Sequence, residues 1–303
     1  MIEVTELNVY PIKGCRGVSL QKMEMDARGP ALDRRFMIVD GAGDFVTQRE
    51  QPRLALVGPT WVADALELRA PGMPDLSIPL RADVSTRERI EVRVWRFQGE
   101  ALLVSEEADA WLTEWLGTSC RLVACDPHME RRSNPEWTRG VVPIAFPDAY
   151  PVLLTSEASL RALNTAIRDR DPDADLLTMN RFRPNLVVRG CEAFEEDDWV
   201  RVRVGGMELE IVKPCDRCGV TTVDPKTAEK GKEPLLTLAR MRKSEQGVLF
   251  GQNCVPQGSG FIQRGSELEV LEDGGLKKVP ASWRVFPDSD GPGATEHKAR
   301  KTT

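Results

Sequence analysis

The feature of this sequence best suited to chemistry is a Cys-x-x-Cys motif. Its cysteines are Cys215 and Cys218, with Lys213 before them and Arg217 between them. The motif follows residues 207–212, whose apolar and polar residues alternate as in a strand. Cationic neighbours favour the thiolate form of a cysteine, which is the form that binds metals and acts as a nucleophile. The motif therefore predicts a thiolate site at the end of a strand.

Four interpretations of this motif stay open from the residues alone. A structural zinc site needs about four ligands, and the remaining cysteines form no second Cys-x-x-Cys pair. A thioredoxin-like redox pair would open a helix, whereas poor helix formers such as Thr221, Thr222 and Val223 follow Cys218. The third interpretation is a single thiolate that binds a soft metal whose other ligands belong to a cofactor. The fourth is two ordinary cysteines in a turn.

Basic residues stand at several other turns of the chain: Lys13, Arg34, Arg35, Arg181 and Arg183. Lys13 and Gly14 lie in a flexible turn that could hold a phosphate. The arginines precede apolar stretches at 36–39 and 186–188. Arginines beside buried strands need partners, and a phosphate that accepts two hydrogen bonds is a suitable one. Asp148 could hydrogen-bond a heterocycle, although each of these residues taken alone also fits an ordinary surface turn.

The composition excludes several functional classes. A formal net charge of −6 argues against a general nucleic-acid binder, which needs clustered Lys and Arg facing phosphates. The apolar runs are strand-sized, far shorter than the roughly 20 residues of a membrane-spanning helix. The first residues also lack the pattern of a signal peptide, so we expect a cytoplasmic protein without a membrane span. Two histidines exclude a His-rich metal site, and seven irregularly spaced cysteines argue against a disulfide framework.

Short apolar segments at regular spacing predict a β-rich first half, typical of a barrel or sandwich. Strands are expected at residues 3–11, 35–40, 54–57, 65–69 and 90–95, with 45–49 completing a hairpin after 35–40. A helix is expected over 106–116, because Trp111 and Trp115 recur on one face and Gly117 favours a stop. These tryptophans and Trp95 are assigned to the core rather than to a substrate platform.

The second half is also predicted to be β-rich. After a strand at 121–125, the Pro- and Arg-rich segment 127–147 is expected to be a long loop, and Ser156 is expected to cap a helix. Further strands are expected at 185–188, 200–204, 207–212, 261–262 and 268–271. We therefore predict a mainly β (α+β) chain with one domain over 1–120, a second over 121–286 and a disordered polar tail over 287–303.

Taken together, these segments resemble the MOSC family, which is named after the C-terminal part of molybdenum cofactor sulfurase. The closest resemblance is to its YcbX and mitochondrial amidoxime-reducing component branch. The first-half motifs are YPIKGCRG (10–17), DRRFMIV (33–39) and VTQREQPRL (46–54). The second-half motifs are LTSEASL (154–160), RFRPN (181–185), CDRCGVTTVDP (215–225) and FGQN (250–253). They occur in family order over nearly the whole chain.

The resemblance implies an N-terminal β-barrel-like domain beside a β-rich MOSC barrel domain, with a mononuclear molybdopterin cofactor between them. In the family, the second cysteine of the motif is the molybdenum ligand, which corresponds to Cys218, and Cys215 would be structural. The family's cofactor-contacting positions correspond to Lys13, Arg35, Asp148 and Arg183, and Gly14 and Arg181 are expected to contact the cofactor beside them. Relatives carry a serine at the position of Gly14, so a backbone group would replace its hydrogen bond.

The resemblance further implies an oxidoreductase that uses molybdenum to remove oxygen from small N-hydroxylated compounds. Cys218 would be the metal ligand, and Asp148 would orient the pterin or relay a proton. Some relatives carry a C-terminal iron–sulfur domain. Because no cysteine follows Cys254, electrons are expected from a separate ferredoxin or flavin reductase type of protein. The alternatives are a sulfur-carrier or cofactor-delivery protein with a Cys218 persulfide, and a redox-inert module that binds an anion.

Overall fold

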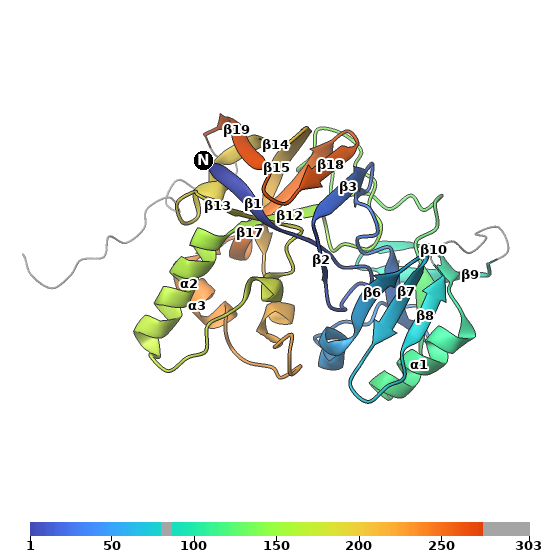
Figure 1. Ribbon diagram of the computed structural model, residues 1–303. Coiled ribbons are helices and arrows are strands. Elements are labelled where there is room, and N and C mark those ends of the chain that lie inside the picture. Colours follow the sequence, from blue (N-terminus) through green and yellow to red (C-terminus); the bar gives the residue numbers. More distant parts are fainter. Residues whose placement is uncertain (80–86, 275–303) are drawn as a thin grey trace, which may run out of the picture.

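The computed structural model describes residues 1–79 and 87–274 (Figure 1). The predicted mainly β fold is confirmed. The α-helices of the described residues are α1 (Glu106–Leu116), α2 (Glu157–Arg170) and α3 (Leu235–Met241). No helix in these two ranges is long and apolar enough to cross a membrane. The tail expected over 287–303 lies outside the described residues.

A closed barrel of seven strands lies within the largest sheet of the described residues. In spatial order its strands are β12 (Val152–Ser156), β13 (Leu186–Arg189), β1 (Ile2–Val9), β19 (Glu267–Asp273), β14 (Trp199–Val204), β15 (Met207–Asp216) and β17 (Gly247–Gln257). The pairing of β17 with β12 closes the ring. Only β12 and β13 run parallel within it. Because the ring is closed, each of these seven strands has a paired neighbour on both sides.

The first residues of the chain are built into this barrel. Strand β1 pairs with β13 on one side and β19 on the other, and β2 (Val18–Leu20) pairs with β1. Strand β3 (Lys22–Asp26) then pairs with β18 (Gly260–Gln263) and with β4 (Gly29–Pro30). Strands from both sides of the boundary predicted near residue 120 therefore pair with each other. A short strand, β16 (Lys243–Ser244), extends the sheet beyond β17.

The rest of the first half forms two smaller sheets beside the barrel (Figure 1). One contains β5 (Phe36–Asp40), β11 (Cys120–Ala124), β10 (Phe97–Leu103) and β9 (Arg89–Val94). The other contains β6 (Gly58–Val62), β7 (Ala65–Arg69) and β8 (Leu76–Pro79). Helix α1 buries Trp111 and Trp115 against this region. It ends at Gly117 in the left-handed conformation, as predicted.

Two expected strands of the first half are wrong. Residues 54–56 belong instead to a 3₁₀ helix, Pro52–Leu56, with Val57 as its C-cap, because the fixed φ of proline favours the first turn of a helix. Residues 45–49 form no strand, and Phe45 makes only an isolated bridge to Val39. The chain at 45–49 instead lines a cavity described below. In both places, residues that favour a turn or the start of a helix therefore outweighed the local apolar pattern that predicted a strand.

The long loop expected over 127–147 is present between β11 and β12. Its end is held by the buried guanidinium of Arg131, which donates hydrogen bonds to the carbonyls of Ala145 (2.7 Å), Pro147 (2.7 Å) and Asp148 (3.1 Å). A charged donor to several carbonyls fixes a loop that has no sheet partners. The loop is therefore ordered where it brings Asp148 to the cavity.

The predicted cap of α2 is confirmed. The Ser156 hydroxyl accepts a hydrogen bond from the backbone N–H of Ser159 at 3.1 Å, which satisfies one free donor of the first turn. Helices α2 and α3 lie on the same side of the barrel (Figure 1), where Leu163, Phe250 and Leu238 share a buried cluster. This packing supports the barrel wall, and part of that wall lines the cavity described below.

Candidate functional site

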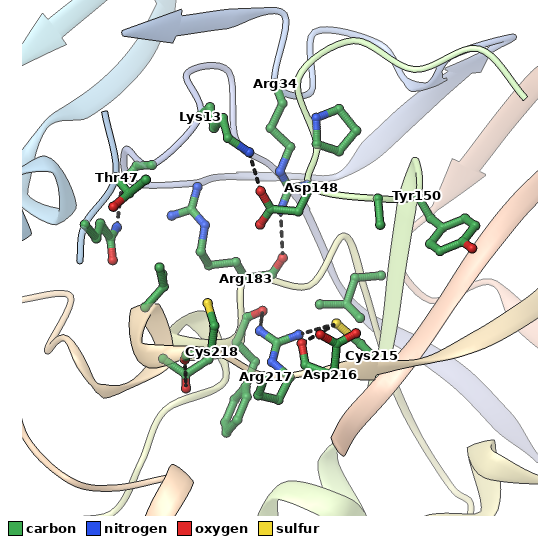
Figure 2. Close-up of a pocket in the computed structure, with 18 of the residues that line it drawn as sticks. Lys13, Arg34, Thr47, Asp148, Tyr150, Arg183, Cys215, Asp216, Arg217 and Cys218 are labelled. Atoms are coloured by element: carbon green, nitrogen blue, oxygen red, sulfur yellow. Dashed lines mark hydrogen bonds and ion pairs between the residues drawn. The ribbon is translucent and has the colours of Figure 1, made fainter. Parts of the chain in front are cut away.

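A cavity of about 440 Å³ lies where segments from both halves of the chain meet (Figure 2). The first half contributes Lys13, Gly14, Arg34, residues 45–49 and Trp95. The second half contributes residues 147–150, Phe182, Arg183, Asn185 and residues 215–218 with Val220 and Thr221. Most of the predicted site residues are thus brought together from distant parts of the sequence.

The Cys-x-x-Cys motif forms the floor of the cavity in the view of Figure 2. Strand β15 ends at Asp216, and a short 3₁₀ helix (Gly219–Thr222) begins after Cys218. The Sγ atom of Cys218 points into the open space (Figure 2), and this side chain is exposed. The connection between strand and turn thus presents one thiol to the cavity.

Cys215 lies in a different environment from Cys218. Its Sγ accepts a hydrogen bond from Nη1 of Arg217 at 2.8 Å, and Nη2 of the same guanidinium donates to the carbonyl of Phe182 at 2.6 Å. Burial raises the pKa of the Cys215 thiol, and Arg217 opposes that rise only in part. Cys215 therefore has a structural contact, whereas Cys218 has a sulfur free to meet a ligand.

This geometry narrows the interpretations of the motif. Among residues 1–79 and 87–274, no group of three or more His, Cys, Asp or Glu side chains could hold a metal ion by itself. All seven cysteines are free thiols, and the motif leads into a 3₁₀ turn rather than an α-helix. The zinc and thioredoxin-like interpretations therefore find no support, whereas a single cysteine sulfur facing a cofactor and two ordinary cysteines in a turn both remain open.

Lys13 and Asp148 form an ion pair across the cavity wall (Figure 2). The Lys13 ammonium also donates to the carbonyl of Phe146 at 3.0 Å, and the indole N–H of Trp95 donates to Oδ1 of Asp148 at 3.1 Å. Loss of hydration would raise the pKa of the Asp148 carboxyl, whose side chain is 65% exposed, but Lys13, Trp95 and Arg34 together hold it well below its usual range. Asp148 is therefore a carboxylate that accepts hydrogen bonds at neutral pH.

Two further cations are held by one buried aromatic ring. The guanidinium carbons of Arg34 and Arg183 lie 4.6 Å and 4.3 Å from the ring centroid of Tyr10. The Tyr10 hydroxyl donates to the carbonyl of Pro184 at 3.2 Å, so the ring is fixed at its far end as well. Cation–π contacts of this kind place two like charges close together without bringing them into direct contact.

Arg183 is a partly buried cation that is held at its guanidinium. Its Nη1 donates to the carbonyl of Cys15 at 2.5 Å, and burial together with nearby Arg34 lowers its pKa to about 10. It is still protonated at neutral pH, so it presents a positive charge with little surrounding water. Gly14 lies nearby with φ +86°, where a Cβ would come within 3.2 Å of Leu54 Cδ1. The turn therefore favours glycine and exposes backbone to the cavity.

Arg35 and Arg181, also expected at the cofactor, do not line the cavity. Arg35 makes hydrogen bonds of 2.8 Å and 2.7 Å to the two carboxylate oxygens of Asp26, and Arg181 donates to Asp224 at 2.7 Å. Arg34 lines the cavity instead. Arg34 lies in the turn before β5 with φ +47°, so the backbone there does not follow strand alternation, and the sequence does not show which of the two arginines faces the cavity.

The sequence interpretation also missed Trp95. The core assignment is confirmed for Trp111 and Trp115, which are 6% and 4% exposed, but it is wrong for Trp95, which is 52% exposed and lines the cavity. The position of Trp95 in the sequence could have indicated that its side chain is exposed. Trp95 and Arg96 are the two residues between strands β9 and β10, and a hairpin turn lies at the surface.

Comparisons with known proteins agree with this architecture. The MOSC N-terminal beta barrel domain matches residues 1–119, and the MOSC domain matches residues 142–269. Mitochondrial amidoxime reducing component 2 of Bos taurus is 39% identical over 79% of this chain and 72% of its own length. Mitochondrial amidoxime-reducing component 1 is 36% identical in Mus musculus and 34% in Homo sapiens, in each case over 88% of this chain and 82% of the relative. The chain therefore belongs to the MOSC family, in the branch of the amidoxime-reducing components.

Proposed function

We propose that this protein is a molybdenum-cofactor-dependent oxidoreductase that reduces small N-hydroxylated compounds with electrons from a separate redox protein. The observation that carries the proposal is the Sγ of Cys218, which points into a cavity surrounded by fixed cations. The names of the relatives support the reaction class, because they describe amidoxime reduction. The family's association with the molybdenum cofactor supports the metal.

The residues of the cavity fit an anionic, metal-bearing pterin. Cys218 would supply a soft sulfur ligand for the molybdenum. Lys13, Arg34 and Arg183 supply positive charge toward a phosphate, and the backbone of Gly14 can approach it closely. We therefore propose these residues as the cofactor contacts. Arg35 and Arg181 would support the cofactor site from outside the cavity. They would do so by forming ion pairs with Asp26 and Asp224.

The bound cofactor would supply a metal that exchanges two electrons with the substrate. In the net reaction, the N–O bond of the substrate breaks, two electrons and two protons are taken up, and the oxygen leaves as water. Asp148 is ionised, so its proposed role is to accept hydrogen bonds from the pterin or the substrate and to hold Lys13 in place. The protein's contribution is thus positioning and electrostatics, as in other cofactor enzymes.

The electron donor is proposed to be a ferredoxin or flavin reductase type of protein. The described cysteines are free thiols scattered over the structure, and none of them forms a cluster suited to iron and sulfur. The cytoplasmic location stays a prediction, since the curated relatives are named as mitochondrial proteins.

The first experiment measures molybdenum and pterin in protein made by a host that synthesises the cofactor. The matched variants are Cys218→Ser and Cys215→Ser, which make the same change at the two cysteines of one motif. We expect near-stoichiometric metal in the wild type and in Cys215→Ser, and a large loss in Cys218→Ser. Full activity with stoichiometric molybdenum in Cys218→Ser would contradict the proposal.

The same preparations separate the proposal from sulfur transfer. Cyanide releases the outer sulfur of a persulfide as thiocyanate. Metal-free wild type that yields one thiocyanate per chain, lost in Cys218→Ser, would favour the sulfur-carrier alternative. Protein with neither metal nor releasable sulfur would favour an anion-binding module.

A further inference from the structure

Trp95 occupies a backbone position that a tryptophan rarely adopts. It is the first of the two residues that connect β9 to β10, and its φ is +58°. Gly, Asn or Asp usually fill such positions, because a bulky side chain is strained there. Strained residues concentrate at functional sites, where the surrounding structure holds them in place. The tight turn brings the indole to the cavity wall rather than into the core.

Contacts from two segments, residues 45–49 and the loop that carries Asp148, fix the orientation of the indole. Its N–H donates to Oδ1 of Asp148 at 3.1 Å. The ring of Phe45 packs against it edge-on, with centroids 5.0 Å apart and an interplanar angle of 60°. The guanidinium of Arg49 lies 5.0 Å from its centroid. The indole is therefore a rigid surface whose orientation is set before any ligand arrives.

Trp95 stays exposed despite these contacts. The residue is 52% exposed, and it lines the same cavity as Cys218. An exposed, preoriented aromatic face in a binding cavity attracts planar conjugated ligands through stacking and burial of apolar area. An aliphatic ligand of the same functional group gains only a small apolar contact from the same face.

We propose that Trp95 is a specificity-determining residue whose indole face selects N-hydroxylated substrates in which the C=N–OH group is conjugated with an aromatic ring. This inference rests on the proposed function of the cavity. The inference concerns a preference for stacking. It therefore predicts the ratio of the kcat/KM values for two substrates rather than the reduction itself.

The test compares Trp95→Ala and Trp95→Phe with the wild type, all loaded with cofactor and normalised to molybdenum content. Benzamidoxime is the aromatic substrate and acetamidoxime the aliphatic one, with reduced methyl viologen as the electron source. In Trp95→Ala, the ratio of kcat/KM for benzamidoxime to that for acetamidoxime should fall roughly three- to tenfold, mainly through a higher KM for benzamidoxime. Trp95→Phe should keep most of the ratio, because it retains an aromatic face.

The outcomes separate this inference from the proposed function. An unchanged ratio in Trp95→Ala would overturn the role of Trp95 while leaving the reductase intact. An equal loss of the ratio in Trp95→Phe and Trp95→Ala would show that the hydrogen bond to Asp148 matters rather than the aromatic face, which also overturns it. Wild-type protein that holds molybdenum but reduces neither substrate would instead contradict the proposed function.

Discussion

The interior of the barrel and the lining of the cavity differ in both composition and backbone geometry. The barrel encloses apolar side chains such as Trp199, Leu209 and Val202 on paired strands. The cavity is lined by cations and carboxylates, and Arg34, Trp95 and Arg183 in its wall all have positive φ. A closed barrel can hold a strained and charged rim because its own strands leave no edge to open. Stability is therefore concentrated in one region and the proposed chemistry in the other.

The largest expected effect breaks the barrel. Trp199 is 2% exposed at the start of β14, so Trp199→Ala should lower the free energy of unfolding by about 3–5 kcal/mol. Arg201→Ala on the same strand is the matched control. Arg201 is exposed and pairs with Glu208 at 3.4 Å, and such surface pairs contribute about 1 kcal/mol or less. Urea unfolding measures both, and similar losses would contradict the assignment of stability to the interior.

The second prediction concerns Glu196, which is fully buried behind the barrel wall. Its Oε1 accepts a hydrogen bond from Ser159 at 2.7 Å, whereas Oε2 has no hydrogen-bond partner in the described structure. Burial, and next the neighbouring carboxylate of Asp197, raise the pKa of Glu196 to about 7. The unfolded chain releases this proton near pH 4.3, so folding becomes less favourable as pH rises from there to about 7.

Replacing Glu196 by glutamine should remove this pH dependence. A rise in pKa of this size corresponds to about 3 kcal/mol of stability lost between pH 4 and pH 7. The difference in the free energy of unfolding between Glu196→Gln and the wild type should therefore favour the variant more at pH 8 than at pH 4.5, by up to about 3 kcal/mol. Urea unfolding of both proteins at the two pH values measures the difference. Parallel pH profiles would show that Glu196 titrates normally.

A third prediction tests how the loop before β12 supports the cavity. Arg131→Met removes three hydrogen bonds to the carbonyls of the segment that carries Asp148, so we expect a loss of about 2 kcal/mol. Molybdenum retention should fall as well, because Asp148 and its partner Lys13 lose their support. Arg132→Met is the control, since the Arg132 side chain is exposed and its guanidinium pairs with Glu130 at 3.5 Å. Equal molybdenum content in the two variants would contradict this role for Arg131.

The local elements were predictable because their signals are short-range. Helix α1 follows from the spacing of Trp111 and Trp115 with Gly117 behind them, and β7 follows from an alternating apolar pattern. The placement of β1 between β13 and β19 has no such signal. Barrel closure depends on pairing between residues far apart in the sequence, which residue patterns do not encode locally.

The site was predictable in its chemistry but not in its detail. The residues alone left the Cys-x-x-Cys motif open, and the family resemblance distinguished Cys218 from Cys215. Which arginine of the pair Arg34 and Arg35 faces the cavity depends on a positive φ at Arg34, and a run of two arginines does not reveal it. Trp95 was misassigned because an apolar side chain favours the core unless a turn overrides it.

The smallest expected effect isolates the strain at Trp95 from its contacts. Trp95→Gly and Trp95→Ala both remove the indole with its contacts to Asp148, Phe45 and Arg49. They differ in the backbone, because glycine adopts φ near +58° without the clash that a Cβ brings. The free energy of unfolding of Trp95→Gly should therefore be about 1 kcal/mol higher than that of Trp95→Ala.

The adjacent residue supplies the control for this comparison. Arg96 is in the same turn but is not among the residues with positive φ, so Arg96→Ala should be at least as stable as Arg96→Gly. The two Trp95 variants should also show the same loss of substrate selectivity, since neither has an aromatic face. Equal stability of Trp95→Gly and Trp95→Ala would mean that the turn stores no strain. A gain for glycine at position 95 alone would show that the cavity wall trades stability for the placement of one indole.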